Sequence, residues 1–264
     1  ERSQPESVEL VAFTRNFVND YRESHPLETD VLQPVDTGTR TAAMVDPQMM
    51  REPGMGTLQH FSIVPFFTMI RFGQWDKILA TPQPEADLKY PTGIWHYARG
   101  LAFNAQGEIV KAQQELEALD LLADDPELEK VTIWDLNTTQ EILRVADEVL
   151  TGEIAAQEGK NLRAIAHLRQ AVNLEDALNY NEPADWSIPV RQYLGAALLK
   201  AKHYDAAAKV YREDLAIYPD NGWSLYGLSE SLQAQNKNVE AKDVQQKFEF
   251  AWQYADVQLT ASKF

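Results

Sequence analysis

The chain has 264 residues, of which 44% are hydrophobic and 24% charged, and its formal net charge at pH 7 is −16. A strongly acidic surface repels nucleic-acid phosphates and anionic lipid headgroups, so neither is an expected partner. The chain has no cysteine, which excludes disulfides and thiolate sites, and its longest apolar stretch is about half of a membrane span. We expect a soluble protein without membrane insertion, cytoplasmic or periplasmic.

The first 56 residues differ in pattern from the rest. PESVELVAFTRNFVNDYRE has the spacing of one amphipathic helix, which would be the second helix of a repeat whose first helix is missing. Residues 24–56 contain several prolines around a methionine cluster and predict a long loop that packs on the following domain or is partly disordered. We expect this N-terminal helix and loop over 1–56 and a helical repeat domain over 57–264.

Helical spacing recurs in fixed phase near the C-terminus, where two consecutive segments align at a constant offset of 34 residues. The aligned pairs are Leu194 with Leu228, Gly195 with Ser229, Leu198 with Leu232, Lys202 with Asn236, and Ala207 with Ala241. Each unit predicts a helix, a short polar turn and a second helix, with small residues where helices must approach closely. Pro219 in YPDNG ends one unit because proline cannot continue the hydrogen bonding of a helix.

Three further copies precede these two. IWHYARGLAFNAQGEIVKAQQELEAL and VLTGEIAAQEGKNLRAIAHLRQAV keep the small residues, and HFSIVPFFTMIRFGQWDKILA is a degenerate copy. The turns then fall at 73, 107, 159, 202 and 236, so that two of the four intervals carry insertions. We expect the longer insertion, DDPELEKVTIWDLNTTQE, to lengthen helices or to add a short one; the shorter is LNYNEPADW.

This pattern resembles the tetratricopeptide repeat, a helix pair of about 34 residues. The resemblance implies an all-α fold, a right-handed α-solenoid of about five helix pairs with a concave inner surface. More narrowly, YREDLAIYPDNGWSLYGLSESLQAQ and ADVQLTASKF resemble the C-terminal end of a family of long bacterial tetratricopeptide-repeat proteins of uncertain function. That resemblance implies a natural end at Phe264 and a missing N-terminal half, and it carries no catalytic residues.

The concave surface predicts a groove for an extended peptide or a partner helix. By their register, Tyr97, Asn104, Trp223, Tyr226 and Glu230 should face it. Aromatic side chains with polar tips supply contact area at low entropic cost, which suits peptide binding. The alternative is that the aromatic residues pack between repeats.

A second candidate pocket lies in YNEPADW and the helix after it. Tyr180, Glu182, Trp186 and Arg191 could form a pocket with one anion and one cation, in a segment that Pro183 stiffens. The alternative is a rigid spacer in which Trp186 covers the core.

Metal binding and catalysis have no support in the sequence. The five histidines have no partner at helical spacing and no HExxH motif occurs; they are His25, His60, His96, His167 and His203. There is also no GxSxG motif, no P-loop and no complete dinucleotide fingerprint. We therefore expect no metal, no cofactor and no enzymatic activity.

Two functions remain open. The first is a non-catalytic scaffold that holds a protein or peptide partner in the groove. The second is a structural or oligomerisation role as the C-terminal half of a longer protein, whose ligand, metal or catalytic site would lie in the absent part. An exposed Tyr97 and Tyr226 would favour the first, and a groove filled by residues 24–56 would favour the second.

Overall fold

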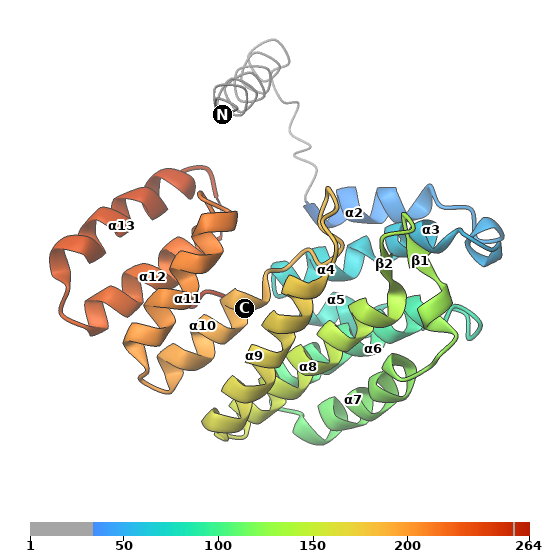
Figure 1. Ribbon diagram of the computed structural model, residues 1–264, viewed down its shortest axis with the longest axis horizontal. Coiled ribbons are helices and arrows are strands. Elements are labelled where there is room, and N and C mark those ends of the chain that lie inside the picture. The colour runs from blue at the N-terminus through green and yellow to red at the C-terminus, as the bar shows by residue number, and fades with distance from the viewer. Residues whose placement is uncertain (1–33, 256) are drawn as a thin grey trace, which may run out of the picture.

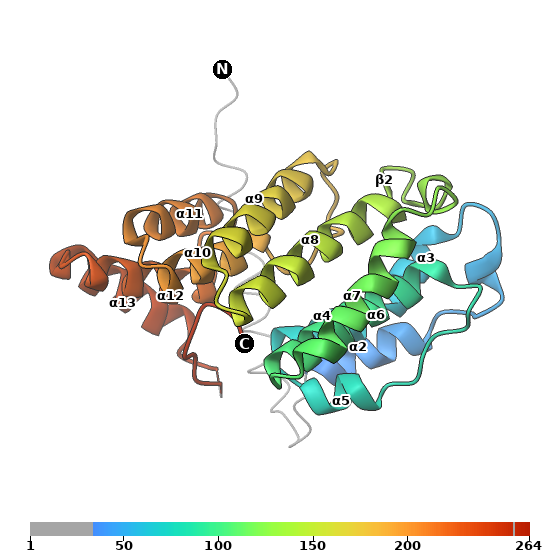
Figure 2. The same ribbon diagram turned by 90° about the horizontal axis from the view of Figure 1, so that it is seen from below.

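The computed structural model describes residues 34–255 and 257–264. In this part of the chain the regular structure is helical apart from one short hairpin, which confirms the expected all-α class. Figures 1 and 2 show the helices stacked in a curved row that runs from α2 and α3 at one end to α13 at the other.

Helix pairs form the body of the molecule. They are α4 (Val64–Arg71) with α5 (Trp75–Ala80), α6 (Lys89–Ala105) with α7 (Ile109–Ala123), α8 (Thr139–Gln157) with α9 (Asn161–Ala177), α10 (Val190–Lys200) with α11 (Tyr204–Ile217), and α12 (Gly222–Ala234) with α13 (Asn238–Ala251). Each helix packs against its partner, and the first helix of each pair packs against the first helix of the next. The first helices therefore form one continuous layer.

The same turn joins the two helices of every pair. The residues in left-handed backbone conformation are Gly73 (φ 60°), Gly107 (φ 78°), Gly159 (φ 77°), Lys202 (φ 64°) and Asn236 (φ 60°). The amide of the next residue bonds to the carbonyl five positions back, as between Glu108 and Phe103 at 2.8 Å. This Schellman motif satisfies carbonyls at the helix end. All five turn positions expected from the repeat register are confirmed.

Small residues stand where helices cross. A Cβ atom added to Gly100 would lie 2.4 Å from Leu150 of α8, and one added to Gly195 would lie 2.3 Å from the Tyr211 ring of α11. On the second helices the corresponding alanines are buried, namely Ala112, Ala164, Ala207 and Ala241. The expected close approach of helices at these positions is therefore confirmed.

The predicted loop over 24–56 is partly helical in its described residues. It contains α2 (Pro34–Ala43), the 3₁₀ helix η1 (Met49–Arg51) and the first residue of α3 (Gly56–Ser62). α2 begins with a proline, which the first helical turn tolerates, and packs against α4. Because α4 supplies this tertiary contact, the segment is helical where its own composition indicated a loop. The amphipathic helix expected before it lies outside the described residues.

The longer insertion was expected to lengthen helices or to add a short one, and it contains a short 3₁₀ helix and the first residues of α8. It forms a 3₁₀ turn, η2 (Leu128–Lys130), followed by an antiparallel hairpin of β1 (Thr132–Ile133) and β2 (Asn137–Thr138). Trp134 and Asp135 at the hairpin turn have φ of 54° and 57°, in the left-handed region, and three residues separate the paired Ile133 and Asn137. The chain then enters α8 through a capping box of Thr138 and Glu141.

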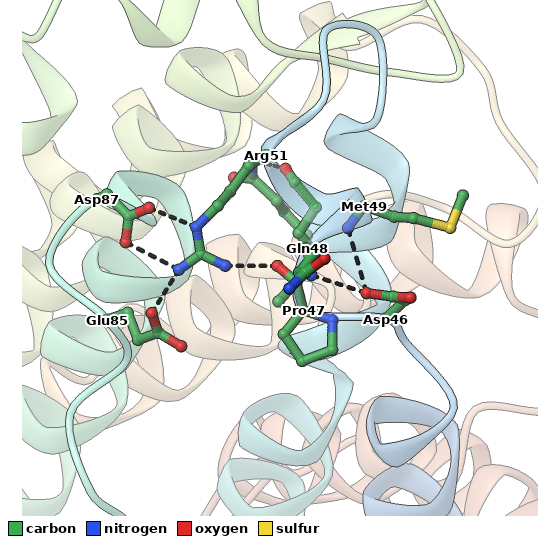
Figure 3. Close-up of polar contacts among 9 residues, drawn as sticks. Asp46, Pro47, Gln48, Met49, Arg51, Glu85 and Asp87 are labelled. Atoms are coloured by element: carbon green, nitrogen blue, oxygen red, sulfur yellow. Dashed lines mark hydrogen bonds and ion pairs between the residues drawn. The ribbon is translucent and has the colours of Figure 1, made fainter.

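Arg51 attaches the N-terminal segment to the connection between α5 and α6. Its guanidinium lies 2.5 Å from carboxylate oxygens of Glu85 and Asp87, and it donates to the carbonyl of Pro47 (Figure 3). The hydrogen bond from Arg51 holds the pKa of Asp87 below its usual range. Because exposed ion pairs contribute little stability, this contact mainly positions the segment.

Candidate functional site

The C-terminal segment over 257–264, which we call the tail, folds back onto the first helices. Figure 1 places the C-terminus at the centre of the molecule, near α10. Ser262 is 1% exposed, and its Oγ lies 2.6 Å from the Tyr211 hydroxyl and donates to the Gln192 carbonyl at 3.1 Å. Phe264 packs on Gly73, where an added Cβ would approach it to 3.1 Å. The tail thus contacts the first helix pair, at the turn that holds Gly73, and the fourth helix pair, at Gln192 and Tyr211.

An ion pair anchors the tail to α8. Lys263 Nζ lies 2.5 Å from Oε2 of Glu153, whose side chain is 5% exposed. Its ammonium group also lies 5.9 Å from the centre of the Tyr193 ring. A buried carboxylate that loses its cation is strongly destabilising. The tail is therefore part of the packed structure.

A cavity of about 440 Å³ remains beside the tail. Its walls come chiefly from the first helices α6, α8 and α10, with Trp75 of α5 and the tail itself completing them. Residues that line it include Leu101, Asn104, Glu153, Tyr193, Ala196, Lys200 and Phe264. Of the predicted groove residues, Asn104 lies here; it is buried and donates to the Glu153 carbonyl at 3.3 Å.

α4 covers the inner surface farther along the row. The Arg71 guanidinium carbon lies 3.6 Å from the centre of the Trp223 ring, and Arg71 donates to the side chain of Gln192. The Phe72 ring packs edge-to-face on the same indole, with 6.4 Å between ring centres. The Trp252 ring of the last pair does so with 4.5 Å between ring centres. Burial lowers the pKa of Arg71 to about 10. Trp223 is therefore a packing residue.

The other predicted groove residues have different environments. Tyr97 is 0% exposed and lies 5.5 Å from the Trp186 ring, so it does not line an open groove. The reason is tertiary: Trp186 and α4 cover the face of α6 that the repeat register turns inward. Tyr226 is half-buried against Phe248 at 5.6 Å, and Glu230 is exposed.

The four residues predicted for the second pocket do lie together. Tyr180, Glu182, Trp186 and Arg191 all line one cavity of about 860 Å³ between the end of α9, the connection over 178–189 and α11. We call this the joint cavity. Trp186 also covers the core, since it is 2% exposed and its ring centre lies 5.3 Å from that of Phe67.

Buried amides hold the wall of the joint cavity in place. Asn137 of β2 donates to Asp185 at 2.7 Å and to the Asn179 carbonyl at 3.0 Å, and it accepts from the Asn179 amide at 2.7 Å. Asn181 donates to the other oxygen of Asp185 at 2.8 Å. Asn137 could not be assigned to this wall from the sequence, because only the hairpin brings it to residues more than 40 positions later in the chain.

Carboxylates dominate the joint cavity. Arg191 forms a bidentate pair with Asp176, with both N–O distances 2.7 Å. Burial raises the pKa of Glu175 to about 8, and burial also raises the pKa of Asp214. Neither acid was identified from the sequence, because acidic residues are frequent along this chain and their burial depends on the packing of α11.

Three histidines each pair with one acidic or phenolic side chain, and His167 also accepts from Arg163 at 3.5 Å. His96 pairs with Glu115 at 2.6 Å, His167 with Glu148 at 2.7 Å, and His60 with the Tyr90 hydroxyl at 2.8 Å. Over 34–255 and 257–264, no group of three or more metal-ligating side chains could hold an ion. His25 lies outside these ranges. In the same part of the chain, no helix has the length and apolar character needed to cross a bilayer.

Comparisons with protein-family models, with curated proteins and with solved structures yield no match to this chain.

Proposed function

We propose that the chain is a tetratricopeptide-type α-solenoid that acts as a non-catalytic scaffold and binds a peptide along its first helices. The recurring turns and small residues support the repeat type. The observation that carries the function is the tail itself. A non-helical peptide of this chain already lies on that surface, held by side chains from several helix pairs.

The contacts of the tail indicate what such a peptide would need. Glu153 offers a buried carboxylate to a basic side chain, and the Tyr211 hydroxyl offers a hydrogen bond to a small polar one. The cavity next to Phe264 leaves space for a larger apolar side chain. The chain's net charge of −16 would also speed encounter with a basic partner.

A structural or oligomerisation role is the second candidate. It is favoured by the burial of Tyr97 and by the packing of Arg71 on Trp223, since both remove surface from the predicted groove. In that case the tail completes the core, and no other peptide replaces it.

One experiment separates the two. We would delete 257–264 and titrate the shortened chain with a fluorescent peptide of those eight residues, following anisotropy. The scaffold proposal expects saturable binding to the shortened chain and weak binding to the full chain, in which the tail competes at high effective concentration.

Two matched changes test the recognition chemistry. Replacing lysine by alanine at the position of Lys263 in the peptide should weaken binding roughly tenfold, because a charge-assisted hydrogen bond is lost. Glu153→Gln in the shortened chain should do the same, whereas Glu249→Gln, which changes an exposed residue of α13, should leave affinity unchanged. A shortened chain that stays folded by circular dichroism and binds no peptide would support the structural role instead.

A further inference from the structure

The joint cavity carries more negative charge than its positive groups balance. Five carboxylates line it, and they belong to Glu175, Asp176, Glu182, Asp185 and Asp214. Arg191 is the one cationic side chain on the lining, and it already forms its ion pair with Asp176. Within the described residues, no other carboxylate of the cavity has a cation within ion-pair distance.

Neutral donors contact the remaining acids, but Oδ1 of Asp214 is buried and has no hydrogen-bond partner among the described residues. Glu175 accepts from the Val190 amide at 3.1 Å, and Glu182 accepts from the Tyr180 hydroxyl at 2.5 Å. Asp185 accepts from two asparagine amides, and Asp214 accepts from the hydroxyl of Ser224. Burial of charge that is not paired with an opposite charge is costly, so the cavity is preorganised to gain from a bound cation.

The rest of the lining is apolar and aromatic. Leu178, Ile217 and Tyr218 border the same cavity, and Tyr180, which is 80% exposed, lies on its lining next to solvent. Trp186 is almost fully buried on the lining, and its indole N–H has no acceptor among the described residues. Because an ammonium group cannot accept a hydrogen bond, Trp186 would contribute only its ring face to a cationic ligand.

We propose that the joint cavity binds an organic cation, a primary ammonium group on an aliphatic stem. The carboxylates would receive the ammonium group, and the apolar wall and tyrosine faces would cover the stem. The same chemistry occurs in a free diamine and in the lysine side chain of a peptide. The proposal concerns a surface separate from the tail and stands without the proposed function.

Calorimetric titration of the full chain at pH 8.5 tests the proposal with two probes. One is 1,5-diaminopentane and the other is N-acetyl-lysine methylamide, with 1-pentanol as an uncharged analogue. We expect saturable binding of at least one amine and none of the alcohol. Binding of the diamine alone would identify a free amine as the ligand class, and binding of the lysine derivative would identify a peptide side chain. Absence of saturable binding by both would overturn the proposal.

Two variants localise the site. Glu175→Gln keeps the acceptor for the Val190 amide but removes the charge, and it should weaken amine binding roughly tenfold. Glu249→Gln removes one charge from the distant α13 and should not alter affinity. Since Glu175→Gln relieves a buried charge, loss of folding would not explain lost binding, and melting curves check this. Equal affinity in both variants would contradict the assignment.

The pH dependence provides an independent readout. The titratable groups that interact electrostatically with Glu175 are Asp176 on its own helix, Arg191 of α10, Asp214 of α11, and the tyrosines Tyr97 and Tyr218. Amine affinity should rise between pH 6 and pH 9, as Glu175 loses its proton, and binding should release protons into the buffer. Binding enthalpies measured in buffers of different ionisation enthalpy would detect that release. An affinity independent of pH over this range would argue against a role for Glu175.

Discussion

Glu175 links the chemistry of the joint cavity to the stability of the whole chain. Burial raises its pKa to about 8, against about 4.5 for the unfolded chain. Below pH 4.5 both states hold the proton and the group has no effect. As pH rises from 4.5 to 8, the unfolded state releases its proton while the folded state retains it, so folding becomes less favourable.

We therefore expect Glu175→Gln to raise the melting temperature more at alkaline than at acidic pH. The gain should be near zero at pH 5 and reach several degrees above pH 8, since 1 kcal/mol corresponds to about 2–4 °C for a chain of this size. Calorimetric melts of both proteins across this range measure it, with Glu249→Gln as control. An equal gain at pH 5 and pH 9 would show that the buried charge is not its cause.

Gly195 shows how one missing side chain permits a helix crossing. The Tyr211 ring lies between Gly195 and Gly227, and an added Cβ at either would come within 2.3 Å or 2.2 Å of it. Gly195→Ala should destabilise the fold by roughly 1–3 kcal/mol through overpacking. Urea unfolding measures the loss, and adding Tyr211→Leu should recover part of it. If the two substitutions change the free energy of unfolding additively, the glycine and the ring are not in the contact described here.

At the scale of the element, the five turns allow the free-energy cost of a left-handed backbone conformation to be measured apart from the effect of side-chain packing. Gly107 has φ of 78° and no atom within 4 Å of an added Cβ, whereas Lys202 holds the equivalent position with φ of 64°. Lys202→Gly should therefore stabilise the chain by roughly 1 kcal/mol, and Gly107→Ala should destabilise it by a similar amount. The free energies of unfolding in urea test both, and changes of the same sign would refute the common role.

The elements also show what periodicity can and cannot predict. The turns, the crossing glycines and the buried alanines were predicted, because each depends on neighbours in the same helix pair or in the adjacent one. The hairpin over 132–138 was missed, because Trp134 and Asp135 take left-handed conformations without the asparagine or glycine that usually signals them. Four residues of the joint cavity were predicted together because they lie within one short connection and the helix that follows.

At the scale of the whole molecule, the tail connects the last helix pair to the first one. It starts after α13 and ends against Gly73 in the turn between α4 and α5. Its ion pair with Glu153 lies midway along the chain. The tail therefore couples helix pairs that do not follow one another in sequence, and its contacts should unfold together with the core.

Removing only the charge of the tail tests this coupling. Lys263→Met should destabilise the chain by roughly 1–3 kcal/mol, because Glu153 would remain buried without its cation. Adding Glu153→Gln should return most of the loss. A double-mutant cycle from urea unfolding measures the interaction, and a coupling energy near zero would mean that the pair contributes nothing to the fold.

The sequence by itself determined the all-α class, the five turns and the small residues at the helix crossings. These features follow from backbone conformation and from contacts within a helix pair or between neighbouring pairs. Only the tertiary structure decided that Tyr97 is buried, that α4 and the tail cover the inner surface, and that Glu175 and Asp214 share a cavity. Each of those outcomes depends on contacts between segments far apart in the chain, which the local pattern of residues does not encode.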